Sequence, residues 1–202
     1  MSYTETEIKL HVKDLGKLAT RLEALGATLT SPRTYETNLR FDTPAGTLSA
    51  QEQVLRLRQD AQSRLTYKGP TLSVDGVAQR NEIELTVSDF DATRLLIEAL
   101  GYQQVASYEK YRTTYQLGDL HIMLDEMPYG DFIEIEGNDT HRILGLVERL
   151  SLNVGKAVKM SYLEIFRQLC DATELDASQL KFDAVQRGSL HAADVGIEPA
   201  DS

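Results

Sequence analysis

The 202-residue chain contains a single cysteine, Cys170, and no tryptophan. One cysteine excludes an intrachain disulfide and a zinc site built from cysteines. No apolar run approaches the roughly 20 residues that a membrane helix needs. The opening stretch MSYTETEIKL also lacks the basic-then-apolar order of a secretory signal. We therefore expect a soluble cytoplasmic protein without a membrane segment.

Positive charge is in the minority, since 21 Lys and Arg residues stand against 31 Asp and Glu, for a net charge of −10. A surface that follows a nucleic-acid backbone should be basic, so this charge argues against a general nucleic-acid binder but does not exclude a local basic site for a small polyanion. The four histidines are scattered without metal-ligand spacing, and we interpret them as ordinary surface or packing residues. Length and composition fit one compact domain, alone or with a tail.

The chain contains a faint internal repeat: the segment Glu7-Ile8-Lys9-Leu10 is echoed by Glu82-Ile83-Glu84-Leu85. Each copy is followed by leucines spaced three and four apart, which predict an amphipathic helix, and then by Gly26 or Gly101, where that helix would stop. A third, looser copy begins at residues 132–137. Strands dominate and connections are short, so a mostly antiparallel sheet is favoured.

The C-terminal part is expected to differ from the rest. Ser161 and Glu164 form a capping-box pattern, which predicts a helix ending near Leu169 or Cys170. From Asp171 onward the chain is polar and acidic. We therefore expect one domain over residues 1–170, and over residues 171–202 a loosely attached acidic helix and tail that is partly disordered.

Charged residues alternate along most of the expected strands, and neighbours at i and i+2 often share a sign. The acidic pairs are Glu5/Glu7, Glu82/Glu84 and Glu134/Glu136, and the basic pairs are Arg56/Arg58 and Lys110/Arg112. For any single strand the ordinary interpretation is a solvated outer face. Same-sign pairs on strand after strand are unfavourable without opposite partners. If helices cover the apolar face, a closed barrel would turn acidic and basic walls toward each other.

Such a lumen is too polar to be a dry core, and would need water, metal ions and an anionic ligand. Carboxylates suit Mg²⁺ or Mn²⁺, which take oxygen ligands and leave positions open for phosphate. Arginine and lysine suit phosphate oxygens. The pattern predicts a site for a metal-bound polyphosphate. A purely structural domain is the alternative if the charged face proves exposed.

At this point the sequence resembles a known family. Glu5-x-Glu7-x-Lys9 is similar to the ExExK signature of the CYTH, or triphosphate tunnel metalloenzyme, superfamily, which includes class IV adenylyl cyclases, thiamine triphosphatases and inorganic triphosphatases. Further motifs follow in the same order to about Leu169: FDTP from Phe41, LRLR from Leu55, TYKGP from Thr66, RNEIEL from Arg80, YEKYR from Tyr108, LDEMPYGDFIEIEG from Leu124 and SYLEIF from Ser161. The resemblance implies an α+β fold, a closed eight-stranded antiparallel β tunnel with helices packed outside.

The resemblance also implies roles for the charged residues. The implied substrate-binding residues are Arg56, Arg58, Lys68, Arg80, Lys110 and Arg112, and the implied catalytic residues are Lys9, Lys68 and Arg58. The implied ligands of one or two Mg²⁺ or Mn²⁺ ions are Glu5, Glu7, Asp125, Glu134 and Glu136, with Glu82 and Glu84 as helpers.

The leading hypothesis is a metal-dependent triphosphatase acting on tripolyphosphate, a nucleoside triphosphate or thiamine triphosphate. A class IV adenylyl cyclase, which converts ATP to cyclic AMP and pyrophosphate, would use nearly the same lumen. We rank hydrolysis first because it needs neither a nucleobase site nor activation of a sugar hydroxyl. A non-catalytic polyphosphate-binding module is a third alternative. The expected partner is a small-molecule triphosphate, with no nucleic acid and no membrane, and a homodimer is left open.

Overall fold

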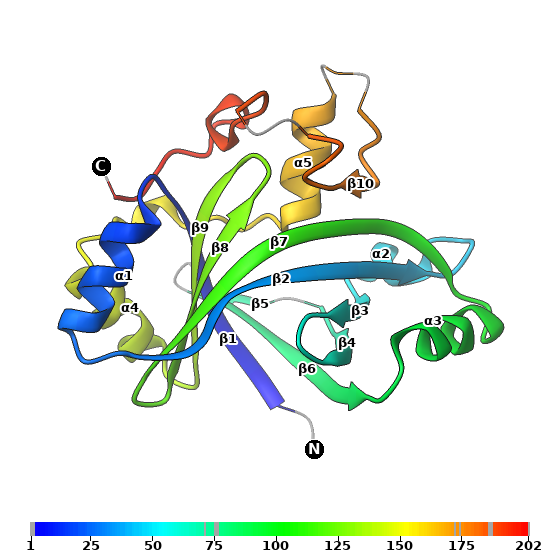
Figure 1. Cartoon of the computed structure of the whole chain (residues 1–202), viewed down its shortest axis with the longest axis horizontal. Helices are drawn as coiled ribbons and strands as arrows, with labels where there is room; N and C mark the ends of the chain where they lie inside the picture. Colours follow the sequence, from blue (N-terminus) through cyan, green and yellow to red (C-terminus); the bar gives the residue numbers. More distant parts are fainter. Residues whose placement is uncertain are drawn as a thin grey trace.

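The computed structural model describes residues 3–70, 72–74, 77–171, 173, 175–185 and 188–201, with the side chains of residues 3–5, 72–74, 77 and 78 left aside. Eight strands pair in the order β1-β9-β8-β7-β2-β3-β4-β6, and β6 pairs again with β1. These strands are β1 (Tyr3–Val12), β2 (Thr28–Asp42), β3 (Val54–Gln59), β4 (Ser63–Lys68), β6 (Val77–Val87), β7 (Gln103–Leu117), β8 (Leu120–Met127) and β9 (Gly130–Gly137). All of these pairings are antiparallel. The expected closed antiparallel tunnel is confirmed (Figure 1).

Two short strands extend this ring. β5 (Leu72–Val74) adds to β6 as a hairpin partner, and β10 (Gln179–Leu180) pairs in parallel with β7. The remaining elements are α1 (Leu15–Ala24), α2 (Thr47–Ala50), α3 (Phe90–Ala99), α4 (Thr140–Arg149), α5 (Tyr162–Cys170) and the 3-10 turns η1 (Val154–Lys156) and η2 (Ala192–Val195). No helix in the described ranges is long and apolar enough to cross a membrane.

Helices cover the outside of the ring on opposite sides (Figure 1). Ile8 and Leu10 of β1 point outward and pack with leucines of α1 and α4 in one buried cluster. Leu39, Leu57 and the helix residue Ile97 form a second cluster under α3. Because strand residues alternate between faces, burying these apolar residues outside sends their charged neighbours inward.

The helix boundaries follow local chemistry. The side chains of Asp14 and Asp89 cap α1 and α3 by accepting hydrogen bonds from backbone N–H groups of Lys17 and Ala92. Gly26 and Gly101 follow the two helices in the left-handed region, at φ +87° and +94°, which glycine adopts without a Cβ penalty. The predicted capping box of Ser161 and Glu164 starts α5.

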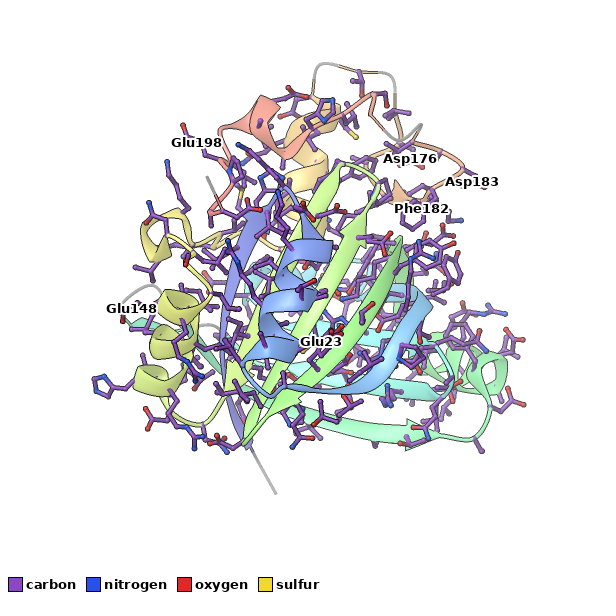
Figure 2. All side chains as sticks on the ribbon, turned by 60° about the vertical axis from the view of Figure 1, so that its left-hand side comes forward. Glu23, Glu148, Asp176, Phe182, Asp183 and Glu198 are labelled. Carbon is purple, nitrogen blue, oxygen red and sulfur yellow. The ribbon has the colours of Figure 1, made fainter. Side chains whose placement is uncertain are left out.

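The C-terminal segment differs from the expected loosely attached, partly disordered tail. In its described residues, Leu180, Leu190 and Ile197 are buried against α5 and the end of the ring. The Asp201 carboxylate accepts hydrogen bonds from the backbone N–H groups of Lys13 and Asp14, before α1. Figure 2 shows the segment, marked by Asp176, Phe182 and Asp183, lying over this end of the ring beside α5. Its apolar residues follow no helical or strand period, so a periodicity search passes over them.

We expect Leu180→Ala to lower the free energy of unfolding by about 2–5 kcal/mol, because it deletes a fully buried side chain. Leu95→Ala is the matched control, since Leu95 on α3 is exposed, and should cost less than about 0.5 kcal/mol. Urea unfolding followed by circular dichroism measures both changes. Equal, small effects would mean that the C-terminal segment does not pack on the ring in solution.

Candidate active site

The ring encloses a polar cavity of about 1000 Å³. Its wall receives charged side chains from seven of the eight strands of the ring, and His121 and Met123 from β8. The lining includes twelve of the residues selected from the sequence: Glu7, Lys9, Arg56, Arg58, Lys68, Arg80, Glu82, Glu84, Lys110, Arg112, Glu134 and Glu136. The alternating charges therefore face one shared, enclosed space and not the outer surface.

Two of the selected residues are placed differently. Asp125 is fully buried behind the cavity wall and does not line the cavity. The side chain of Glu5 lies outside the described ones, although its backbone pairs with Arg80 across β1 and β6. The structure therefore brings all seven predicted cations to the cavity, together with five of the seven predicted carboxylates.

Asp125 organises the basic wall at the middle of the cavity. Its two oxygens accept hydrogen bonds from Arg112 Nε and Nη2, both at 2.6 Å, and one also accepts from Lys110 Nζ at 2.9 Å. Arg112 Nη2 additionally contacts Glu134. A bidentate carboxylate contact holds a guanidinium in one plane. Both oxygens of Asp125 thus accept hydrogen bonds from cationic N–H donors, an arrangement suited to positioning cations more than to coordinating a metal.

Glu36 is a functional candidate that the sequence reasoning missed. It lies on β2, is buried, and faces Lys110 at 3.7 Å, Arg58 at 3.8 Å and Arg112 at 4.0 Å. Burial alone would raise the pKa of Glu36, but the nearby positive charges, Lys110 first, lower this pKa to about 2. The sequence signal that could have identified Glu36 is its spacing of two and four residues from Asn38 and Arg40, which places all three on one face of the strand.

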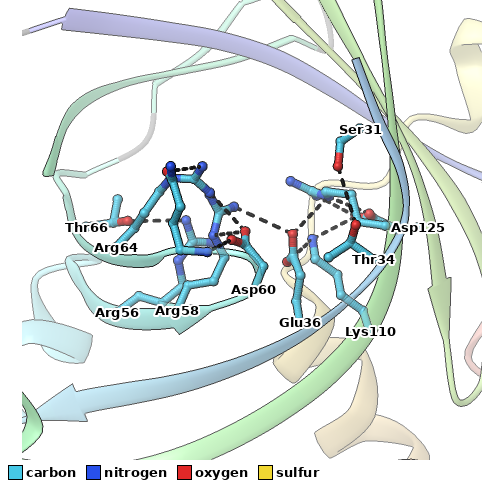
Figure 3. A network of polar contacts seen from close by, with 12 residues as sticks. Ser31, Thr34, Glu36, Arg56, Arg58, Asp60, Arg64, Thr66, Lys110 and Asp125 are labelled. Carbon is cyan, nitrogen blue, oxygen red and sulfur yellow. Dashed lines mark hydrogen bonds and ion pairs between the residues drawn. The ribbon is translucent and has the colours of Figure 1, made fainter. Parts of the chain in front are cut away.

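The opposite wall carries arginines of β3 and β4, drawn together in Figure 3. Arg58 Nε lies 3.4 Å from Asp60, and Arg64 Nη1 donates to the same carboxylate at 2.9 Å. Arg56 reaches the hydroxyls of Tyr108 and Thr66 at 3.5 and 3.4 Å. Burial and the charge of Arg56 lower the pKa of Arg58, with Glu36 only partly offsetting them. For Arg56, burial is outweighed by Tyr108, Glu82 and Glu36, which raise its pKa.

The start of α5 closes one end of the cavity. The Tyr162 hydroxyl donates to Asp125 at 2.8 Å, and Lys9 Nζ lies 4.3 Å from the centre of the Tyr162 ring. Lys9 also donates to the Met160 carbonyl at 3.3 Å and pairs with Glu134 at 3.4 Å. Tyr162 was present in the SYLEIF motif but had no role assigned. It joins the closing helix to the cation cluster.

Carboxylates gather where β1, β9 and β6 meet. Glu7 and Glu136 stand directly opposite each other across β1 and β9, and both line the cavity. Like charges so placed are unfavourable unless a cation lies between or beside them. Arg80 meets Glu7 at 3.1 Å, and Lys68 meets Glu82 at 2.7 Å.

This carboxylate set is a chemical match for Mg²⁺ or Mn²⁺, because both prefer oxygen ligands. No three Asp, Glu, His or Cys side chains among the described residues are already clustered as a metal site. Ion pairs with Arg80 and Lys68 occupy the carboxylates instead. A metal would therefore have to displace or share these contacts.

Comparison with known proteins agrees with this geometry. The model of the CYTH domain family matches residues 3–157. A Methanocaldococcus jannaschii protein with a provisional name as an adenylate cyclase is 26% identical over 173 residues, 80% of this chain and 97% of that protein. The adenylate cyclase CyaB of Aeromonas hydrophila is 30% identical over 135 residues, 65% of this chain and 67% of its own. A solved structure from Vibrio parahaemolyticus shares the fold, with a TM-score of 0.74 at 22% identity, covering 83% of this chain and 99% of its own.

The low pKa of Glu36 predicts a specific pH dependence of stability. A carboxyl whose pKa is lowered by folding stabilises the protein above its ordinary pKa of 4.5, and this contribution is lost as the pH falls toward 2. We expect Glu36→Gln to reduce the unfolding free energy at pH 7 by up to about 3 kcal/mol. The loss of stability between pH 4.5 and 2 should become shallower in this variant.

Urea unfolding across this pH range measures the effect. Glu148→Gln on the exposed side of α4 (Figure 2) is the control and should leave the profile unchanged. A Glu36→Gln profile parallel to that of the unsubstituted protein would contradict the proposed role of Glu36 as a buried counter-charge.

Proposed function

This chain belongs to the CYTH domain family, and we propose that it hydrolyses the terminal phosphoanhydride bond of a small-molecule triphosphate. The observation that supports this most directly is the enclosed cavity, in which basic side chains from β3, β4, β6 and β7 surround one space. Such a wall matches the several negative charges of a triphosphate. The buried setting strengthens each of these interactions because water screens them less.

In this proposal, Lys110, Arg112 and Arg58 bind the middle of the phosphate chain. Asp125 and Glu36 act as positioning residues, since they hold the cations in place without filling the cavity. Arg56, Lys68 and Arg80 add further phosphate contacts. These groups would also stabilise the charge that spreads over the transferred phosphoryl group and the departing diphosphate.

Metal ions enter this proposal through the carboxylates. Glu7 and Glu136 would hold Mg²⁺ or Mn²⁺, with Glu134, Glu82 and Glu84 nearby, and such an ion neutralises phosphate charge and lowers the pKa of bound water. Lys9 and Lys68 place positive charges beside these carboxylates, since they pair with Glu134 and Glu82 at 3.4 and 2.7 Å. The closed α5 end shields the reacting groups from bulk water.

The second candidate function is that of a class IV adenylyl cyclase, which the names of the two curated relatives favour. In that reaction the ribose 3′-hydroxyl attacks the α-phosphorus and pyrophosphate leaves. Cyclisation additionally requires a surface for the base. Among the described cavity residues the apolar side chains are few and scattered, namely Val54, Ala61, Met123 and Leu163. The Tyr108 and Tyr162 hydroxyls contact Arg56 and Asp125. Hydrolysis places no such demand on the cavity.

Product analysis separates these reactions. We expect the purified protein with Mg²⁺ or Mn²⁺ to release orthophosphate from inorganic tripolyphosphate, which has no base and no sugar. Cyclic AMP and pyrophosphate from ATP, without orthophosphate from tripolyphosphate, would instead establish the cyclase. Tight triphosphate binding without either set of products would refute both reactions.

Replacement of Glu7 tests the carboxylate site. Glu7→Gln should raise the metal concentration needed for half-maximal activity by about tenfold, because an amide is a weaker ligand than a carboxylate. Glu23→Gln on the exposed side of α1 is the matched control and should leave the metal titration unchanged. An identical titration for Glu7→Gln would remove Glu7 from the metal site.

Replacement of Arg58 tests the basic wall. Arg58→Ala should lower kcat/KM for the triphosphate by at least about tenfold, since a charge-assisted contact is worth about 1.5–3 kcal/mol. Arg94→Ala on α3, whose partners Asp91 and Glu98 belong to the same helix, is the control. Steady-state kinetics on both variants would reveal equal activities if Arg58 has no contact with the substrate.

A further inference from the structure

Arg40 is the cavity-lining cation with the least compensation. It lies on β2, lines the cavity and has no ion-pair partner among the described residues. Its Nε atom is buried and makes no hydrogen bond. Burial, together with the charges of Arg56, Arg167 and Arg80, lowers the pKa of Arg40, with only Tyr108 acting in the opposite sense. A guanidinium in this setting destabilises the empty protein.

Arg56 stands directly opposite Arg40 on the neighbouring strand, in register across β2 and β3. Both side chains face the same cavity, and like charges opposite each other on a sheet repel. The Arg56 Nε atom is also buried without a hydrogen bond, and the nearest carboxylate oxygen, on Glu84, is 3.8 Å away. On the other side of Arg40 the opposing residue of β7 is Ala106, which is buried and does not line the cavity.

The Arg40/Arg56 pair is separate from the central cation cluster, which consists of Lys110, Arg112 and Arg58. Arg58 lies opposite Asn38 of β2, whereas Arg56 lies opposite Arg40, two residues further along. The two cation groups therefore occupy two levels of the cavity, roughly 6.6 Å apart along the strand. The central level has two buried carboxylates, Glu36 and Asp125, whereas the only carboxylate in ion-pair contact with the Arg40/Arg56 pair among the described residues is Glu84, 3.8 Å from Arg56. Arg40 also lies toward the α5 end of the cavity, because its neighbour Ala106 on β7 belongs to the same buried cluster as Leu163 and Phe166 of α5.

We propose that Arg40 and Arg56 form a subsite for the terminal phosphoryl group of the substrate, at the end of the cavity closed by α5. This inference rests on the proposed function and adds an orientation and a length requirement to it. The first two phosphoryl groups occupy the Lys110, Arg112 and Arg58 level, and the third neutralises Arg40 and Arg56. Any organic part of the substrate then extends toward the open end. A diphosphate fills only the central level, so the protein prefers triphosphates.

Calorimetric titration without added metal measures this preference free of turnover. Inorganic tripolyphosphate and pyrophosphate are titrated in phosphate-free buffer into the unsubstituted protein and into Arg40→Gln. We expect Arg40→Gln to weaken tripolyphosphate binding by about tenfold or more, and pyrophosphate binding by less than about threefold. Equal weakening of both ligands, or no weakening of either, would overturn the subsite.

Arg33→Gln is the matched control, because Arg33 lies on the same strand, is exposed, and pairs with Glu126 outside the cavity. It removes the same charge from the chain and should leave both affinities unchanged. A loss equal to that of Arg40→Gln would show that only the overall charge matters, which also contradicts the subsite.

Thermal unfolding distinguishes a binding role from a structural one. Without ligand, Arg40→Gln should unfold at the same or a higher temperature than the unsubstituted protein, because it removes repulsion, while its stabilisation by tripolyphosphate shrinks. A lowered melting temperature with an unchanged tripolyphosphate shift would make Arg40 a structural residue. Arg40→Lys keeps the charge but not the planar fork, and should bind tripolyphosphate with intermediate affinity.

The two proposals fail in different ways. If tripolyphosphate binds in an Arg40-dependent manner but no orthophosphate is released, hydrolysis is refuted and the subsite stands. If orthophosphate is released and Arg40→Gln keeps the full preference for tripolyphosphate over pyrophosphate, the subsite is refuted and hydrolysis stands.

Discussion

The pairing of β1 with β6 closes the sheet, and this closure dictates the electrostatics of the whole molecule. In an open sheet, the face that carries Glu7, Arg58 and Arg112 would be solvated, and each charge would be screened separately. Closure places these charges in one enclosed space, where each must have a partner, water or a ligand. The ion pairs of the interior are the consequence of this constraint.

The balance between acidic and basic side chains differs from one level of the cavity to the next. At the central level Asp125 and Glu36 face Lys110 and Arg112, so acidic and basic groups balance closely. Toward α5 the arginines exceed the carboxylates. Buried groups left without partners reduce stability, so an excess of one sign is expected where a ligand of the opposite sign supplies the missing charge. The cavity thus has paired charges at its centre and an excess of arginines toward α5.

The closed sheet and the inward charges could be predicted from the sequence because a period of two is visible in single strands. Lys110 and Arg112 form an obvious pair around Tyr111. Glu36 and Arg40 were harder to recognise, since the uncharged Asn38 separates them and they differ in sign. The part played by Asp125 could not be predicted, because its partners lie on β7 and α5 and only folding brings them within hydrogen-bond distance. Register across strands is the information that alternation alone lacks.

Ring closure also bears on how the chain reaches its native state. β1 is synthesised before the other strands of the ring, yet its two neighbours, β6 and β9, follow much later in the chain. The strand that carries Glu136, the neighbour of Glu7 across the sheet, is therefore missing until β9 has emerged from the ribosome. Contacts between such distant segments give a high contact order, which slows folding. Until then β1 has an unpaired edge, and its alternating glutamates and lysine oppose pairing with another nascent chain.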